Sequence, residues 1–510
     1  MKHQLLFIPA FLLSFICISQ ENIDAIEKIK NEGLNNSHVE KIAFELIDKA
    51  GSRLTNSIGY DNAANYAVSQ LTSWGLVNAT KEAWGEFGRG WEINRSYVAM
   101  TKPYYMPFIA VPKAWTESTK GEISGKVTFL DIKTEEDFAK YKGKLKGIIV
   151  AVKPGRGSQD PTFKADALRY TEEELKEMEV PSSSDRRSRT PEELAQFRAQ
   201  RELSQKINAF LLEEEAGLII TGTSGMHGTL FTSSPRAYSK DTPVGLSEFE
   251  MAPEHVNLMA RLFENNVEVE VEAEIKTAFN YADLQGYNVI AEIPGTDNQL
   301  KSEIVMLGGH LDSWHGATGA TDNAAGCIVM MEAVRILQAA GLAPKRTIRI
   351  ALWGGEEQGL HGSRNYVKNH FGNPETMELK DAHNSVSAYY NIDNGTGRIR
   401  GVYLQGNEAV KPIFEEWFKP FIDIIDNTTI TIRNTGGTDH QSFDALSIPG
   451  FQFIQDPVEY WSRTHHTNMD NYERLVIDDL KQMAVIVASF VYNTAQRNEK
   501  LPRKPLKQVE

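Results

Sequence analysis

The chain has 510 residues, of which 41% are hydrophobic and 24% charged, and its formal net charge is −14 at pH 7. A chain of this length exceeds one typical domain, which predicts two or three folded units. The acidic balance argues against nucleic acid or an anionic membrane as the main partner. We therefore expect a globular protein that acts on another class of ligand.

The first residues have the pattern of a secretory signal peptide. A short basic start precedes an apolar run at 5–18, and small and polar residues follow. Residues 1–20 are therefore predicted to be a signal peptide, which implies a secreted or periplasmic protein. An uncleaved anchor is the alternative, but the run is short for a membrane span of ~20 residues. Bulky residues precede Cys17, which disfavours a lipoprotein anchor.

The next two blocks of the sequence differ in their pattern of apolar residues. In 21–100 apolar residues recur every three to four positions, which predicts a helical N-terminal part of the domain that continues after the second block. The second block, 101–281, has short β-rich runs separated by Gly and Lys turns. Its charged stretch at 170–206 predicts a helix, a loop and another helix. We expect a separate β-rich inserted domain with a helical excursion.

Strands and helices alternate in the third block, 282–497. This alternation predicts an α/β domain with a mixed, mainly parallel central sheet flanked by helices. Such sheets place function at the carboxyl ends of their strands. The basic tail, 498–510, is expected to be disordered and carries no predicted function.

Side chains that can bind a metal follow several of these strands where each strand ends. They are His310, Asp312, Glu356, Glu357 and Asp393 at strand exits, Asp322 after a loop of small residues, and Asp439, His440, His465 and His466 in two later loops. Each of these residues alone needs no functional explanation. Adjacent glutamates, for example, usually lie on a solvated face. Together at one sheet edge, close carboxylates would repel and raise each other's pKa. A divalent cation would neutralise them.

The residue types narrow the choice of metal. Histidine with carboxylates and no cysteine suits zinc, with manganese or cobalt as possible substitutes, whereas calcium takes oxygen ligands. Two imidazoles and several carboxylates are enough for two ions. A carboxylate shared between ions ~3.5–4 Å apart would complete a hydrolytic two-metal site.

Four motifs occur together in an order that resembles a known family. They are "GGHLDSW…ATDNAAG", "ALWGGEEQGLHGS", "NIDNG" and "HTNMD", and they closely resemble the M28 family of co-catalytic zinc exopeptidases. The "GHLDSW" form is similar to its carboxypeptidase Q branch. The resemblance runs from Gly286 to the last helix. The middle block, with "LKGIIVAV" and "AGLIITG", is similar to a protease-associated (PA) domain, although its helical excursion is longer than a minimal PA domain needs.

The resemblance implies a ligand set of two zinc ions. His310 and Asp393 would bind one ion, Glu357 and His466 the other, and Asp322 would bridge both.

The resemblance also implies roles beyond the ligands. Glu356 would be the general base, and Asp312 would orient the imidazole of His310. Some relatives have a tyrosine that stabilises the oxyanion where this chain has His465, which leaves His465 and His440 as candidate donors. His315 is expected to line the pocket or the surface rather than bind metal.

The implied function is hydrolysis of terminal peptide bonds in short peptides or dipeptides, with amino-, carboxy- and dipeptidase action all open. One alternative is an inactive receptor or binding protein of the same fold, which is disfavoured because every expected ligand position is filled. Another is a glutaminyl-cyclase-like acyltransferase with a single zinc, which the intact Asp322 and second ligand set disfavour. The family suggests a homodimer, and the middle domain could cap the cleft.

Overall fold

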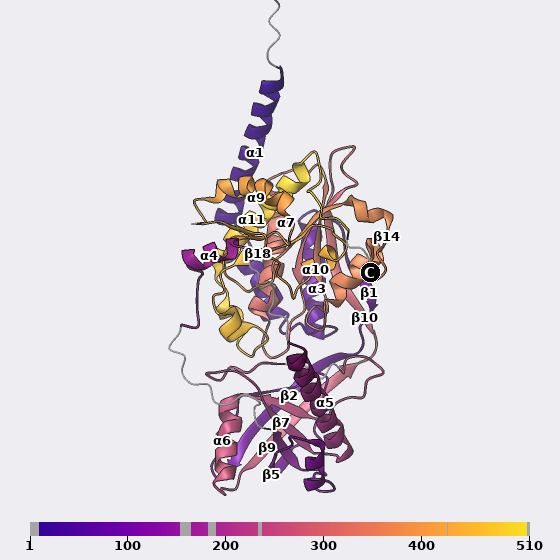
Figure 1. Cartoon of the computed structure of the whole chain (residues 1–510), viewed down its shortest axis with the longest axis vertical. Coiled ribbons are helices and arrows are strands. Elements are labelled where there is room, and N and C mark those ends of the chain that lie inside the picture. The colour runs from indigo at the N-terminus through magenta and orange to yellow at the C-terminus, as the bar shows by residue number, and fades with distance from the viewer. Residues whose placement is uncertain (1–9, 153–164, 182–189, 233–236, 426, 507–510) are drawn as a thin grey trace, which may run out of the picture.

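The computed structural model describes the chain except residues 1–9, 153–164, 182–189, 233–236, 426 and 507–510, with side chains described from residue 23 onward. The described residues form two bodies, each built around one eight-stranded sheet. In Figure 1 the upper body contains α3, α7, α9, α10 and α11, and the lower body contains β2, β5, β7, β9, α5 and α6.

The first sheet is mixed with a parallel centre. Its order is β1 (Val77–Glu86), β10 (Gln285–Ile293), β12 (Thr347–Trp353), β11 (Ile304–His310), β15 (Val386–Asn391), β18 (Gly450–Gln455), β16 (Ile399–Tyr403) and β17 (Thr429–Thr431). Strand β11 pairs in parallel with both β12 and β15, and β15 pairs in parallel with β18. The pairs β1·β10, β10·β12 and β16·β18 are antiparallel, and the edge pair β16·β17 is parallel. The predicted mixed, mainly parallel sheet flanked by helices is confirmed.

Helices cover this sheet. They are α1 (Ala10–Asn35), α2 (Val39–Ala43), α3 (Ile58–Ser73), α7 (Ala325–Ala339), α8 (His361–His370), α9 (Lys411–Phe418), α10 (His440–Asp444) and α11 (Ile477–Gln496). Helix α7 is buried along 325–337 because it packs between β11 and the helices α1, α2 and α11. A helix that is apolar on all sides needs such a position.

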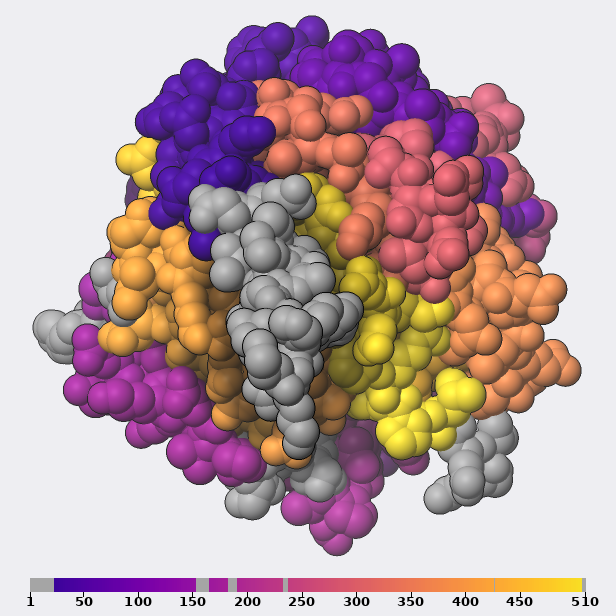
Figure 2. Space-filling view, turned by 90° about the horizontal axis from the view of Figure 1, so that it is seen from above, coloured from indigo at the N-terminus to yellow at the C-terminus, as the bar shows by residue number. Residues whose placement is uncertain are grey.

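Both ends of the chain contribute to this upper body. Figure 2 shows residues that follow position 22, in indigo, on the same face as orange and yellow segments from the C-terminal part. Lys30 of α1 lies 2.9 Å from Asp423, which ties these distant segments together. The predicted signal segment begins outside the described residues, and its remainder, 10–20, lies within α1. None of the helices described has the length and hydropathy of a membrane span.

The second sheet is inserted between β1 and β10, which pair with each other. Its order is β3 (Met106–Pro107), β2 (Gly90–Lys102), β9 (Glu270–Asn280), β5 (Ile123–Leu130), β6 (Ile149–Val152), β7 (Leu218–Gly222), β8 (Glu248–Met251) and β4 (Ala110–Pro112). We call residues 90–280 the insertion. Its core includes Met100, Ile220 and Phe249, and helix α6 (Pro253–Glu264) packs against β7.

Two expectations about the boundaries differ from the structure. Strands β1 and most of β2 lie in 77–100, where the sequence predicted a helical part of the chain, and β2 already belongs to the second sheet. Strand β1 is an edge strand with mostly exposed or half-buried residues, so its sequence lacks a clear apolar alternation. The tail was expected to be disordered from 498. Instead Leu501 is buried, and Arg503 donates to the carbonyl of His383 at 2.9 Å.

The charged stretch contains the two expected helices. They are α4 (Glu172–Glu179) and α5 (Pro191–Glu213), and each begins with a capping box. In these boxes a threonine side chain accepts a backbone N–H while a glutamate three residues later accepts the threonine N–H, which stabilises the helix start. Helix α4 packs against β17 of the first sheet rather than against the second sheet.

Candidate metal centre

The candidate site lies where the parallel strands of the first sheet end. In the register of the sheet, His310 at the end of β11 pairs with Trp353 at the end of β12, and Gly308 pairs with Asn391 at the end of β15. The segments that leave these strands therefore meet at one edge. This is the place where open α/β sheets bind ligands.

An inner group forms around His310, which is buried. Its Nε2 atom lies 3.2 Å from Asp393 Oδ1 and 3.4 Å from Asp322 Oδ1. Ligand atoms of these three residues all lie within 4.8 Å of one another. The structure thus brings together an imidazole and two carboxylates from three different segments.

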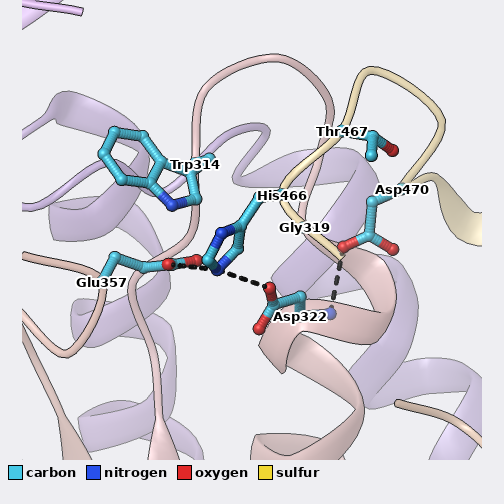
Figure 3. A pocket seen from close by; sticks show the side chains of 7 residues that line it. All are labelled: Trp314, Gly319, Asp322, Glu357, His466, Thr467 and Asp470. Carbon is cyan, nitrogen blue, oxygen red and sulfur yellow. Dashed lines mark hydrogen bonds and ion pairs between the residues drawn. The ribbon is translucent and has the colours of Figure 1, made fainter. Parts of the chain in front are cut away.

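An outer group shares Asp322 with the inner one. His466 Nε2 lies 2.9 Å from Glu357 Oε2 and 3.4 Å from Asp322 Oδ2 (Figure 3). The two oxygens of Asp322 therefore face two different histidines. His465 also belongs here, since ligand atoms of Asp322, His465 and His466 lie within 4.8 Å of one another.

Two further aspartates hold the ligands in place. The carboxylate of Asp312 accepts the backbone N–H groups of Glu356 and Glu357, each at 3.2 Å. The carbonyl oxygen of Asp312 lies 3.0 Å from His310 Nδ1, closer than its carboxylate at 3.6 Å. The expected orienting contact on His310 is therefore made first by the backbone of Asp312. An Nδ1–H that donates there leaves the Nε2 lone pair directed at the carboxylates.

Asp470 is the second of these aspartates, and its role was not predicted from the sequence. One of its oxygens accepts the N–H of Asp322 at 3.0 Å (Figure 3), and the other accepts the N–H of Thr321 at 2.7 Å. It is the aspartate of the quoted "HTNMD" motif, so its place in that motif was the available signal.

Burial and neighbouring charges both shift the pKa values of the site residues. Burial raises the pKa of Glu356 and Glu357 well above the usual carboxyl range, and nearby carboxylates add to this. Burial alone would lower the pKa of His310, but Asp393 and Glu356 outweigh it and raise the pKa well above the usual value. Burial would likewise raise the pKa of Asp322, but the histidines around it hold it below the usual range. Positive charge is thus needed wherever these carboxylates ionise together.

The donor set fits zinc. Asp322 Oδ2 and both side-chain oxygens of Glu357 are buried and, apart from the contacts of Asp322 Oδ2 and Glu357 Oε2 with His466, have no hydrogen-bond partner among the described residues. Buried carboxylate oxygens without partners are costly, and a bound cation would satisfy them. A hollow of about 160 Å³ lies over this group, lined by Trp314, Gly319, Asp322, Glu357, His466, Thr467 and Asp470 (Figure 3). Imidazole and carboxylate ligands at an open position are typical of catalytic zinc.

The remaining candidate histidines have different surroundings. His465 stacks on His466 with ring centres 3.7 Å apart, so it lies beside the outer group. His440 is buried, and its Nε2 lies 2.8 Å from Gln405 Nε2 and 3.2 Å from the carbonyl oxygen of Thr435, neither of which belongs to the metal groups. Burial lowers the pKa of His440 to about 4. The structure therefore brings His465 to the site and surrounds His440 with other residues.

His315 contacts the insertion, and Trp314 contacts the site. His315 Nε2 lies 2.7 Å from the carbonyl oxygen of Pro112 in β4, and its ring packs edge-on against Trp91 of the insertion. It is buried against the insertion and belongs to neither of the two metal groups. Trp314 lines the hollow, and its ring centre lies 6.1 Å from that of His466.

Comparisons with known proteins agree with this geometry. Residues 288–491 match the family model described as Peptidase family M28. Carboxypeptidase Q of Bos taurus is 31% identical over 253 residues, which cover 49% of this chain and 50% of that protein. Aminopeptidase YwaD of Bacillus subtilis is 30% identical over 216 residues, which cover 41% of this chain and 44% of that protein. The chain thus spans about half the length of the curated relatives it matches.

Solved structures share the fold over most of the chain. A Peptidase M28 precursor from Shewanella amazonensis has a TM-score of 0.67 at 21% identity and covers 96% of this chain and 100% of its own. BSAP, a zinc aminopeptidase from Bacillus subtilis, has a TM-score of 0.55 at 19% identity and covers 91% and 96%. At these identities the likeness concerns the fold. The resemblance predicted from the motifs is confirmed over residues 288–491, the part of the chain that contains all the ligand candidates, since this part matches the model of Peptidase family M28.

Proposed function

We propose that the chain is a metallo-exopeptidase that hydrolyses terminal peptide bonds of short peptides or dipeptides at a site with two zinc ions. The observation that carries the proposal is the position of Asp322, whose two oxygens each lie 3.4 Å from the Nε2 of a different histidine, His310 or His466. A carboxylate shared in this way is the arrangement expected of a bridge between two cations.

The ligand assignment follows from the two groups. His310 and Asp393 would hold one zinc, Glu357 and His466 the other, and Asp322 both. Bound zinc lowers the pKa of a coordinated water toward ~7 and polarises a carbonyl group.

Glu356 is assigned as the general base. Its side chain is buried, and burial raises its pKa well above the usual range, which brings a carboxylate closer to the strength needed near neutral pH. Its backbone is anchored through its N–H to Asp312. Glu356 would take the proton from the attacking water and return it to the nitrogen of the leaving amine, so that the peptide C–N bond breaks and two free termini form.

His465 is the better candidate for the oxyanion donor. It stacks on His466 beside the outer ligand group, and burial lowers its pKa, which favours a neutral imidazole with one N–H. A neutral ring can still donate one hydrogen bond to the developing oxyanion. His440 is less suited, because its ring faces Gln405 and Thr435.

The two rival functions predict fewer metals or no turnover. An inactive receptor or binding protein would need no cluster of buried carboxylates, yet Glu357 Oε1 has no hydrogen-bond partner among the described residues and Oε2 faces the ring of His466. A glutaminyl-cyclase-like acyltransferase would use one zinc and would leave the outer group without a purpose. Both rivals fail if the protein binds two zinc ions and cleaves a peptide.

One experiment tests the reaction and its direction. The zinc-loaded protein is given a short peptide in four forms: free, N-acetylated, C-amidated and blocked at both ends, with products read by mass spectrometry. Cleavage that needs a free amino end identifies an aminopeptidase, and cleavage that needs a free carboxyl end identifies a carboxypeptidase. A need for both ends on a dipeptide identifies a dipeptidase. No cleavage of any form by protein with zinc bound would refute the proposal.

We also propose export through residues 1–20 and assembly as a homodimer.

A further inference from the structure

The loop between β18 and α11 carries His465 and His466, and residues of the insertion hold it on two sides. We infer that the insertion positions His466 and thereby sets the affinity of the outer metal site, with Thr232 and Asn468 as the positioning residues. This inference rests on the proposed two-zinc function. It assigns the insertion a part in building the site.

On one side of this loop, residues 228–232 of the insertion pair with residues 466–468. The carbonyl oxygen of His466 accepts the N–H of Thr232 at 2.8 Å and its hydroxyl at 3.2 Å. Asn468 accepts the N–H of Leu230 at 2.8 Å through Oδ1 and donates through Nδ2 to the carbonyl of Gly228 at 3.1 Å. The backbone N–H of Asn468 donates to the carbonyl of Leu230 at 3.2 Å. The ligand residue and its second neighbour are thus both bonded to the insertion.

On the other side, residues 166–169 of the insertion contact the start of the same loop. Leu168 and Val458 exchange two backbone hydrogen bonds, of 2.9 and 2.8 Å. Arg169 donates to the buried carboxylate of Asp456 at 2.9 Å. Asp166 forms an ion pair with Arg463. The loop is therefore bonded at its start and in its middle to segments far from it in sequence.

The contact also reaches the loop that carries Trp314. A Cβ added to Gly316 would lie 2.5 Å from Thr232 Cγ2, so the glycine leaves the space that the threonine occupies. Thr232 is buried between this loop and His466. One side chain of the insertion thus touches two walls of the site.

His466 depends on such support. Its φ is 58°, in the left-handed region that non-glycine residues adopt only when their surroundings impose it. Its side chain is 34% exposed, so packing around the ring fixes it only in part. His310, by contrast, lies at the end of a central strand and is 1% exposed. Loss of the insertion contacts should therefore loosen the ligand at the outer site and leave the inner site unchanged.

Zinc binding by the full-length protein tests this. Metal-stripped protein is titrated with zinc in competition with a chromophoric chelator, and bound zinc is counted by elemental analysis. Asn468→Ala removes both side-chain hydrogen bonds to the insertion, so one of the two affinities should fall about 10- to 100-fold while the other stays within about twofold. Thr232→Val keeps the shape and the backbone N–H, so the same affinity should fall less.

A matched control removes another bond between the insertion and the first sheet. The hydroxyl of Thr431 in β17 donates to the carbonyl of Met178 in α4, away from the ligand groups. Thr431→Val should leave both zinc affinities unchanged.

The outcomes separate the inference from the proposed function. Two zinc ions bound by Asn468→Ala with wild-type affinities would overturn the inference and leave the two-zinc proposal standing. Equal weakening of both sites, or weakening in the Thr431→Val control, would also overturn it, because that indicates general destabilisation. Fewer than two ions in the wild type would refute the two-zinc site and the inference together. If Asn468→Ala does not fold, unchanged affinities in folded Thr232→Val overturn the inference.

Discussion

The carboxylate of Asp470 accepts the backbone N–H of Asp322 at 3.0 Å, although the two residues lie 148 positions apart. Asp470 is buried and holds the turn from which the shared carboxylate of Asp322 projects toward both histidines. A side chain that is not among the expected metal ligands can in this way fix the residue expected to bridge two cations.

Asp470→Asn tests this relationship. The amide keeps the size of the side chain but replaces one of the two accepting oxygens with a donor, so one of the N–H groups of Thr321 and Asp322 is left unpaired. We expect zinc affinity to fall about 10-fold or more and the free energy of unfolding to fall by about 1–3 kcal/mol. Zinc titration and thermal melting measure the two effects. Unchanged zinc affinity would show that Asp470 does not position Asp322.

Glu356→Gln separates catalysis from metal binding. The amide cannot accept a proton from water, so kcat should fall about 10²–10⁴-fold, while both zinc ions stay bound. Asp322→Asn is the comparison, because loss of the shared carboxylate should remove metal as well as activity. The assay is peptide hydrolysis with zinc content measured on the same samples. Retained turnover in Glu356→Gln would refute the base assignment, and full metal occupancy in Asp322→Asn would refute the bridge.

His465 can be tested as donor or ligand. It lies within reach of the outer group, so both roles agree with its position. If it donates to the oxyanion, His465→Ala should lower kcat about 10²–10³-fold with two zinc ions retained, and His465→Tyr should recover part of the loss. If it is a ligand, His465→Ala should lose zinc. Zinc counting beside kinetics distinguishes the two, and an alanine variant with unchanged kcat and zinc would exclude both.

The sequence predicted that the candidate ligand side chains would lie close together, because their positions depend on local features. His310 directly ends a buried strand, and Glu356 and Asp393 closely follow two others, so the parallel order of the sheet brings them to one edge. His466 was chosen over His465 from its motif, and it is His466 that lies 2.9 Å from Glu357. These residues were predictable since alternation of strands and helices fixes where strand ends meet.

What the sequence could not predict depends on contacts between distant segments. Thr232 and Asn468 become important only because the insertion folds back onto the His466 loop. His440 looked equivalent to His465 in sequence, yet its ring turns toward Gln405. The basic tail, 498–510, was predicted to be disordered, but Leu501 is buried. No local pattern encodes these pairings.

Asp439 should make the metal-free protein less stable as pH rises. It is buried, and burial raises its pKa to about 7, whereas an unfolded chain titrates near ~3.9. Between these values the folded state holds a proton that the unfolded state has released, so the free energy of unfolding falls as pH increases from about 4 to 7. Asp439→Asn cannot titrate and should lose this part of the dependence, so its stability relative to wild type should rise across that window. Denaturant unfolding at pH 5 and 7.5, with exposed Asp131→Asn as control, measures the difference. A constant gap between wild type and Asp439→Asn at both pH values would show that Asp439 does not titrate between the two states in this range.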